Sequence, residues 1–392
     1  MQRHFLVLLL LSLTQIVGWG VVGVLPVIAA PVASDLGATL PSIFLGTSVM
    51  YVAMGLTAPL TARAFRRFGT RQAMAAGAAL IGLGLALLAL SPGLMTFWAA
   101  WALIGVAGAA FLTTAAYAYV VEYAQEQARG LIGTLMLVTG LAGSVFLPVT
   151  AFLDHLIGWR DALLVYAAVM ALAVGPLLWF GLPATEATAA VAARRGAGSH
   201  GRIFVLLVAA IALNSFVTFG IQAVGVPLLQ AMGMDLARAV AVASLLGVFK
   251  VGGRVLDLLG GGRWDGLSTG IAAGAMIPLG LAAIWIGGAG LLPVVGYLLL
   301  FGVGSGAFAV ARATMPLVFF DKAGYAAAMA AIALPMNLIN ALAPPALAVS
   351  MEQAGAPVTF ALLGGLSVLA LAALLALSRL RTPPAQAQAP AA

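Results

Sequence analysis

The chain has 392 residues, of which 63% are hydrophobic and only 7% charged, whereas soluble domains are about 25% charged. This composition excludes a soluble globular protein and predicts an integral protein of the lipid bilayer. A formal net charge of +7 would suit a nucleic-acid-binding protein, but the basic residues are dispersed among loops and no predicted soluble domain gathers them on one face. We therefore expect no nucleic-acid partner.

The first apolar segment starts directly after Arg3 and His4 and continues to residue 30. A secretory signal has a shorter apolar region followed by polar residues, so we interpret this segment as the first membrane span. Windows of about 20 residues then predict further spans along the whole chain. The twelve predicted spans are residues 5–30, 43–63, 73–91, 94–121, 130–153, 160–182, 203–227, 239–260, 268–287, 290–312, 324–349 and 357–378.

The spans fall into two sets of six, which predicts an all-α membrane protein of two pseudo-symmetric six-helix bundles, at residues 1–182 and 203–380. The polar and small residues 183–202 are predicted to link the bundles, and residues 381–392 to form a disordered tail. Glycine and arginine clusters follow spans two and eight, about 190 residues apart. This parallel arrangement indicates an internal duplication, which in transporters builds a central cavity.

The distribution of basic residues predicts the orientation, because positively charged loops stay in the cytoplasm. With a cytoplasmic N-terminus, only Arg160 and Arg238 lie outside. The thirteen basic residues on the inner side are Arg3, Arg63, Arg66, Arg67, Arg71, Arg129, Arg194, Arg195, Arg202, Arg263, Lys322, Arg379 and Arg381. We therefore expect a multi-pass protein of the cell inner membrane whose two termini and inter-bundle linker are all cytoplasmic.

Span eight carries three charges, Lys250, Arg254 and Asp257, in an otherwise apolar segment. At about 100° per residue, their spacing puts all three on one helix face. Lys250 lies roughly 17 Å into a hydrocarbon core about 30 Å thick. Either Asp257 holds the two cations in a structural ion pair, or this face lines a watery cavity and binds an anion. Asp257 is the carboxylate candidate for proton coupling, and Lys250 is the alternative, because a bound anion favours its charged form.

The loop after span two reads Arg66-Arg67-Phe68-Gly69-Thr70-Arg71 and resembles the D-R-x-G-R-[RK] loop of the major facilitator superfamily, without its acidic first position. Arg66, Arg67, Gly69 and Arg71 are thereby predicted to form the conformational loop of that twelve-helix fold. Further motifs are similar to the monocarboxylate-transporter-like branch. They are Gly18-Trp19-Gly20 in span one, Gly69-Thr70-Arg71, Ala142-Gly143-Ser144 in span five and Gly158-Trp159-Arg160 at the start of span six.

This resemblance implies that Arg254 stands at the branch's arginine position in span eight and holds a substrate carboxylate. Lys250 stands where the branch has an aspartate, and Val27 follows Pro26 where the branch has a lysine. The positive charge of span one is thus absent, and Lys250 is expected to supply the second positive charge of the site.

Other polar side chains fit either a cavity or helix packing, and Trp19 also fits a membrane interface. The candidates for substrate binding are Gln15 and Trp19 in span one, Asn214 and Gln222 in span seven, and Asn337 in span eleven. Arg312 ends span ten, where we expect it to extend to the inner surface. Tyr117 near the inner end of span four is expected in the aromatic belt.

We expect no enzyme, metal or cofactor. His155 and His200 lack neighbours at ligand spacing, no nucleophile is paired with a base, and the glycines of residues 302–306 are helix-packing positions rather than a phosphate loop. The sequence predicts a monomeric secondary active transporter, a symporter or antiporter, for a small organic anion, most simply a monocarboxylate. The alternatives are an exporter of a hydrophobic or drug-like compound and a membrane receptor without transport.

Overall fold

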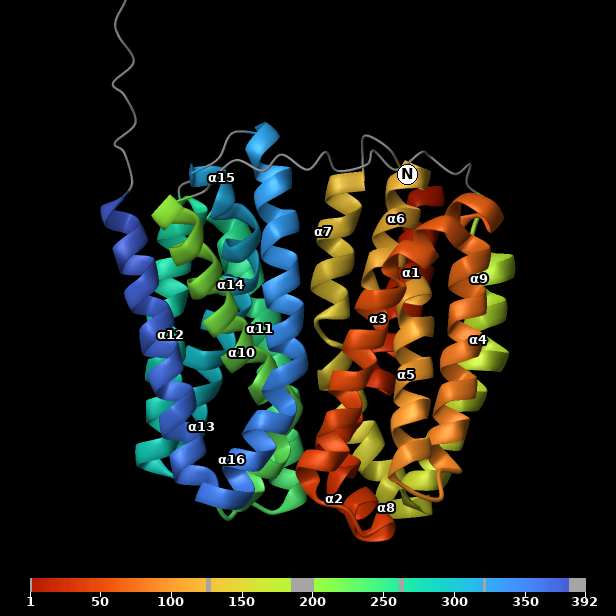
Figure 1. Ribbon diagram of the computed structural model, residues 1–392, viewed down its shortest axis with the longest axis horizontal. Coiled ribbons are helices and arrows are strands. Elements are labelled where there is room, and N and C mark those ends of the chain that lie inside the picture. Colours follow the sequence, from red (N-terminus) through yellow and green to blue (C-terminus); the bar gives the residue numbers. More distant parts are fainter. Residues whose placement is uncertain (1, 125–127, 185–200, 261–263, 320–321, 381–392) are drawn as a thin grey trace, which may run out of the picture.

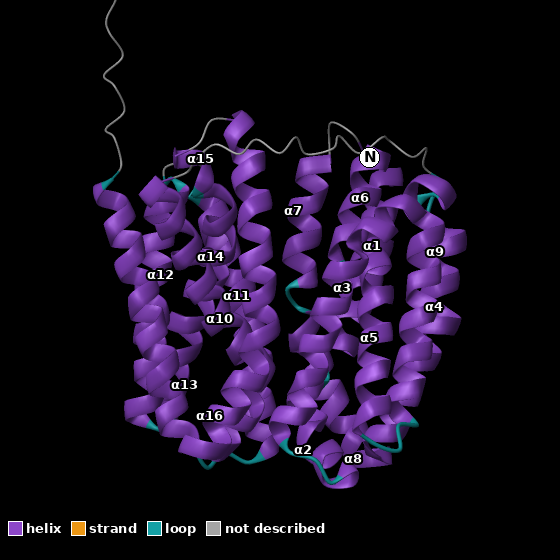
Figure 2. Ribbon diagram, in the orientation of Figure 1, coloured by secondary structure: helices purple, strands orange, loops and turns teal. Residues whose placement is uncertain are grey.

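The computed structural model describes residues 2–124, 128–184, 201–260, 264–319 and 322–380. Within these residues every regular element is a helix (Figure 2). The predicted all-α membrane fold is therefore confirmed. Most of the predicted linker, and the predicted tail at 381–392, lie outside the described residues.

The first half of the chain contains nine α-helices and one π-helical turn in the part that the structure describes. They are α1 (Gln2–Val22), α2 (Leu25–Leu36), α3 (Leu40–Phe68), α4 (Thr70–Ala89), α5 (Leu94–Phe111), α6 (Thr113–Ala124), α7 (Ala128–Thr139), α8 (Ala142–Ala168), η2 (Val169–Val174) and α9 (Gly175–Gly181). The second half follows with α10 (Gly201–Ala231), α11 (Leu236–Leu259), α12 (Gly266–Gly287), α13 (Leu291–Tyr297), η3 (Leu298–Gly302), α14 (Val303–Thr314), α15 (Pro316–Phe319) and α16 (Lys322–Arg379).

Ten of the described segments are long and apolar enough to cross a membrane. Two of them are long enough for two crossings and change direction at a glycine of positive φ, Gly158 (φ 80°) in α8 and Gly355 (φ 81°) in α16. Glycine adopts this left-handed φ without the penalty that a side chain would add. Figure 1 shows α16 running toward the end of the molecule away from the N-terminus and then returning. Counting the two arms of each segment separately gives twelve crossings, in agreement with the prediction.

The two halves repeat the same arrangement of elements. Leu40 begins α3 and Leu236 begins α11, 196 positions later, and Gly355 follows Gly158 by 197. The helices α3 and α11 also each have a side-chain N-cap: the Thr39 hydroxyl accepts from the Ser42 amide, and the Asp235 carboxylate accepts from the Arg238 amide. The halves lie side by side (Figure 1), and α3 packs on α16, α8 on α11 and α2 on α10.

Three spans of the first half are interrupted, although each was predicted as one continuous helix. Span one breaks between α1 and α2, span four between α5 and α6, and span five between α7 and α8. Span seven, the counterpart of span one, is the single helix α10. An interrupted helix leaves amide and carbonyl groups without partners inside a membrane, which is tolerated only where protein or a cavity receives them.

Candidate functional site

A cavity of about 410 Å³ lies between the two halves, and both halves contribute residues to its wall. This volume is within the range of small-molecule sites, which is about 300–1,000 Å³. All three interruptions of the first half border it, through Gly23, Thr113 and Gly140. The three interruptions of the first half therefore lie at the cavity wall.

Three cations line this cavity, Lys250 and Arg254 from α11 and Arg312 from α14. Its lining residues, all within the described part of the chain, include no Asp, Glu or His. The Lys250 ammonium makes no hydrogen bond or ion pair to any described residue. Uncompensated cations at this depth cost free energy, so they indicate a site that takes up negative charge.

Arg254 connects the two halves through a carbonyl that the break in span five exposes. Its Nη1 donates to the Met136 carbonyl at 2.7 Å, in the last turn of α7, where carbonyl groups have no partner in the helix. The positive guanidinium also suits the negative end of the helix dipole. A Cβ atom on Gly140 would lie 2.6 Å from this Nη1, so a side chain there would push the guanidinium from its present position. The Arg254 Nε is buried and has no hydrogen-bond partner among the described residues.

The cations stand on two helices that pack with their backbones in contact. A Cβ atom on Gly306 of α14 would overlap the Lys250 carbonyl of α11, and one on Gly253 would overlap the Val303 carbonyl. The prediction that the glycines of residues 302–306 serve helix packing is therefore confirmed. Because neither backbone can shift freely, α11 and α14 hold the three cations as one rigid unit.

Residues 8–300 match the sequence pattern of the Major Facilitator Superfamily. The chain belongs to this family. It is thus a multi-pass membrane protein of a transporter family, and its interior cavity lies between the halves as in other transporters built from repeats. A search of curated proteins finds no match to the sequence.

Solved structures share the fold of this major facilitator protein. A bacterial homologue of the human lysosomal transporter Spinster, in an inward-facing and occupied conformation, has a TM-score of 0.74 at 17% identity, over 97% of this chain and 98% of that one. The nucleoside transporter NupG has a TM-score of 0.77 at 14% identity, over 95% and 99%. The human organic anion transporter MFSD10 has a TM-score of 0.66 at 17% identity, over 95% and 99%.

The structure separates the other predicted site residues of this family member into two groups. Trp19 and Gln222 line the cavity, and the Trp19 Nε1 donates to the Thr113 Oγ1 at 2.8 Å, at the start of α6. Gln15 and Asn214 are fully buried and do not line it. The Gln15 amide instead donates to the carbonyl of Phe111, the last residue of α5, at 2.8 Å.

For Asn214, no described residue is a hydrogen-bond partner of the side-chain amide. The side chain of Asn337, the fifth candidate for substrate binding, lies outside the described residues.

Asp257 does not pair with the cations of α11. The Thr269 hydroxyl of α12 donates to its carboxylate at 2.9 Å, and Asp257 is not a lining residue of the cavity. Lys250 lies two helical turns away, about 10 Å along the axis, which is too far for an ion pair. The Arg254 side chain tilts toward the start of the helix, as helical side chains do, and thus away from Asp257.

Arg312 and Tyr117 are cavity residues that the sequence analysis assigned elsewhere. Both line the cavity, and both lie within electrostatic range of Arg254. The expected extension of Arg312 to the inner surface is therefore wrong. Its Cβ tilts toward the start of α14, and hence toward the cavity. A basic residue at the end of a predicted span was the only sequence signal, and it also fits a surface position.

The loop of Arg66, Arg67, Gly69 and Arg71 joins α3 to α4 away from the cavity. Gly69 has φ 85°, which explains the glycine of the motif. Arg71 donates to the Leu182 carbonyl at 3.1 Å, whereas Arg66 and Arg67 are exposed. Thr70 donates to the carboxylate of Glu122 at 2.7 Å, so α6 supplies an acidic group to a loop that lacks its own.

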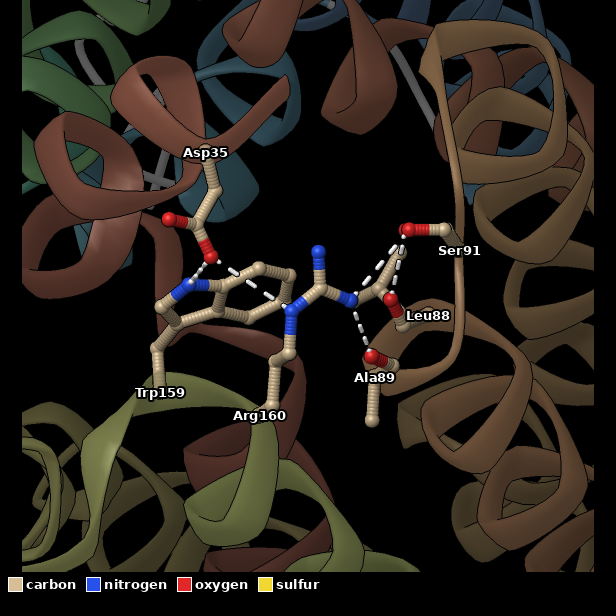
Figure 3. Close-up of polar contacts among 6 residues, drawn as sticks. All are labelled: Asp35, Leu88, Ala89, Ser91, Trp159 and Arg160. Carbon is tan, nitrogen blue, oxygen red and sulfur yellow. Dashed lines mark hydrogen bonds and ion pairs between the residues drawn. The ribbon is translucent and has the colours of Figure 1, made fainter.

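The Gly158-Trp159-Arg160 motif lies at the end of the first half away from the N-terminus, where α2 and α8 meet (Figure 1). Trp159 and Arg160 form a clamp there with residues of two other helices (Figure 3). The Trp159 Nε1 donates to the Asp35 carboxylate at 2.9 Å, and the Arg160 Nε lies 3.4 Å from the same oxygen. Arg160 also donates to the Ala89 carbonyl at 2.6 Å, and its guanidinium lies 4.3 Å from the Trp159 ring centre. This clamp ties α2, the end of α4 and α8 together, so the motif is structural.

Contacts between the halves close the cavity on the side away from the N-terminus. The rings of Tyr51 and Phe219, which line the cavity, meet edge to face at 5.1 Å. The Ser48 hydroxyl donates to the Ala341 carbonyl. Beyond them, the backbone amide of Leu40, the first residue of α3, donates to the Glu352 carboxylate at 2.9 Å.

Proposed function

We propose that this major facilitator protein moves a small organic anion across the membrane by alternating access to the cavity between its halves. The observation that supports this most directly is the set of three cations in a cavity without a lining carboxylate or histidine. In the proposed complex, Arg254 binds a substrate carboxylate through two parallel hydrogen bonds and Lys250 adds a second positive charge.

The contact of Arg254 with Met136 connects binding to movement in this proposal. A carboxylate is a stronger acceptor for a guanidinium than a peptide carbonyl is. An arriving substrate therefore competes with the Met136 carbonyl and weakens a contact that joins the two halves. Substrate binding then favours a state in which the halves have a different relative position.

We further propose that the N-terminus faces the cytoplasm of an inner-membrane protein, and that the conformation described is open to the cytoplasm. This orientation is supported by the sequence, which assigns thirteen basic residues to the side of the N-terminus and two to the other side. The hydrogen bonds Ser48 to Ala341 and Leu40 to Glu352 close the opposite side. The Leu40–Glu352 bond must break when the cavity opens outward.

Replacing Glu352 with glutamine should shift the protein severalfold toward the outward-open state, because an amide oxygen accepts a weaker hydrogen bond from the Leu40 amide than a carboxylate does. The chain contains no cysteine, so Thr47→Cys introduces a single thiol in the cavity wall. Its labelling by a membrane-impermeant reagent from the outside should become faster in the Glu352→Gln background.

Asp235→Asn is the matched control for this experiment. Asp235 also caps a helix start, but it accepts from Arg238 of its own half. It should leave the labelling rate unchanged. Equal labelling rates in the parent and in Glu352→Gln would show that this bond does not hold the outer side closed.

A monocarboxylate is the simplest substrate under this proposal, and the position of Arg254 supports the monocarboxylate-transporter-like branch. One observation favours the alternative of a hydrophobic or drug-like compound exported from the cell. Aromatic side chains form much of the wall, among them Phe44, Phe146 and Phe219. The cations favour the anion, because an uncharged compound would leave all three without an anionic partner.

Thermal unfolding of the purified protein tests these two functions directly, since a ligand that binds the folded state raises the apparent stability. We expect carboxylates to raise the melting temperature, and uncharged hydrophobic compounds and organic cations not to. Uptake of a stabilising carboxylate into proteoliposomes should then follow, which also excludes a receptor without transport. Stabilisation by the uncharged compounds alone would contradict the anion proposal.

Lys250 is the proposed proton carrier. The other basic groups among the cavity-lining residues, all in the described part of the chain, are guanidiniums, which do not lose their proton in proteins. The lining residues Tyr51 and Tyr117 are phenols, and a phenol ordinarily titrates near 10. Asp257 lies outside the wall and binds Thr269. If an anion binds together with a proton on Lys250, the net charge that crosses the membrane is smaller than the charge of the anion alone.

Substrate affinity should therefore depend on pH between about 6 and 9 in the parent, and this dependence should be lost in Lys250→Arg, which stays charged. Asp257→Asn is the control and should keep the dependence of the parent. If the parent and Lys250→Arg show the same pH dependence, another group carries the proton.

A further inference from the structure

Arg312 has no anionic partner in the cavity. Its Nη1 approaches the Met336 sulfur at 3.8 Å, and a thioether is only a weak acceptor. Within the described residues no carboxylate forms an ion pair with it. The guanidinium nevertheless keeps its charge, because arginine is not deprotonated in proteins. The cavity therefore holds a permanent positive charge that the binding of one carboxylate to Arg254 would leave unmatched.

The three cations occupy successive heights along the rigid pair of helices α11 and α14. Gly306 of α14 packs against the Lys250 backbone, which sets the two helices in register. From that level, Arg254 begins about 6 Å and Arg312 about 9 Å further along the axis, at 1.5 Å per residue. Tyr117 of α6 lines the same cavity and lies within electrostatic range of both arginines. Two guanidiniums and a phenol hydroxyl are therefore close to one another in the cavity wall.

We infer that the substrate carries two anionic groups, one bound by Arg254 and the second by Arg312, with the Tyr117 hydroxyl as a further donor. This inference rests on the proposed function and narrows its substrate class from an organic monoanion to a small dianion. Two permanent guanidinium charges are then matched by two negative charges, which lowers the cost of holding them in a low-dielectric site. Lys250 is left as the group that gains or loses a proton.

A second anionic group can be a carboxylate or a phosphonate, since a guanidinium binds either through two hydrogen bonds. We expect a dicarboxylate. The test is a set of matched pairs in which only the second group differs: propionate and malonate, butyrate and succinate, valerate and glutarate. Each pair is measured by thermal stabilisation and by uptake into proteoliposomes, and 3-phosphonopropionate replaces succinate in a separate arm.

In the parent, at least one dicarboxylate should bind roughly ten- to a hundredfold more tightly than its monocarboxylate, as expected for a hydrogen-bonded charge pair. In Arg312→Gln this dicarboxylate should bind no better than its monocarboxylate, because its affinity should fall much further than that of the monocarboxylate, which loses only the long-range attraction of the charge. Arg312→Lys should retain part of the preference, because it keeps the charge but not the paired hydrogen bonds.

Equal affinities within every pair of the parent would overturn the dianion inference and leave the organic-anion function intact. This comparison uses the parent alone, so it remains decisive if Arg312→Gln does not fold. Binding of 3-phosphonopropionate above all dicarboxylates would support the second anionic group and identify it as a phosphonate or phosphate. If no member of any series binds, the organic-anion function itself fails.

Discussion

Replacing Arg254 with alanine is expected to abolish substrate uptake. The substitution removes the proposed carboxylate ligand, and it also removes the hydrogen bond to the Met136 carbonyl that joins the two halves. Loss of a charged, buried hydrogen-bond donor weakens binding by about 3–5 kcal/mol, more than a hundredfold. Initial uptake rates in proteoliposomes measure this effect, at equal amounts of reconstituted protein.

Arg254→Lys separates the charge from the geometry. A lysine keeps the positive charge but cannot form two parallel hydrogen bonds to a carboxylate, so we expect partial uptake. Gly140→Ala provides a second perturbation, because its Cβ would lie 2.6 Å from the Arg254 Nη1 and displace the guanidinium. Unchanged uptake in Arg254→Ala would contradict the proposed binding role.

Gly306→Val should have the second large effect, on stability as well as on transport. Any side chain at this position overlaps the Lys250 carbonyl, which is backbone and cannot rotate away. The substitution must push α11 and α14 apart, and overpacking of this kind costs about 1–3 kcal/mol. We expect a lower melting temperature, and we expect weaker anion binding because the three cations lose their relative positions.

Gly252→Ala is the matched control on the neighbouring helix. A Cβ atom there meets no atom within 4 Å, and alanine is favoured over glycine inside a helix by about 1 kcal/mol. The melting temperature should therefore stay the same or rise. A normal melting temperature and normal binding in Gly306→Val would show that the close packing of α11 and α14 does not position the site.

Apolar runs and repeats in the sequence were enough to predict a membrane protein with twelve spans in two similar halves, because the runs are long enough to span and the repeats recur at a constant offset. The sequence also indicated Lys250 and Arg254, because two cations on one face of an apolar helix have few structural explanations. The sequence does not distinguish Gly158 and Gly355 from the other glycines. The backbone geometry identified them as the two positions where one helix ends and the next begins in a new direction.

The set of polar residues that share the cavity became clear from the packing of the helices in space. Gln15 and Trp19 are four residues apart on one helix. The Gln15 amide donates to the Phe111 carbonyl and does not line the cavity, whereas Trp19 does. Asp257 binds Thr269 on the next helix, and Arg312 turns inward rather than to the surface. Helical periodicity predicts the face on which a side chain lies, but the partner of that side chain depends on which helix packs against the face. In lipid this packing is set by small residues and backbone contacts rather than by hydrophobic patterning.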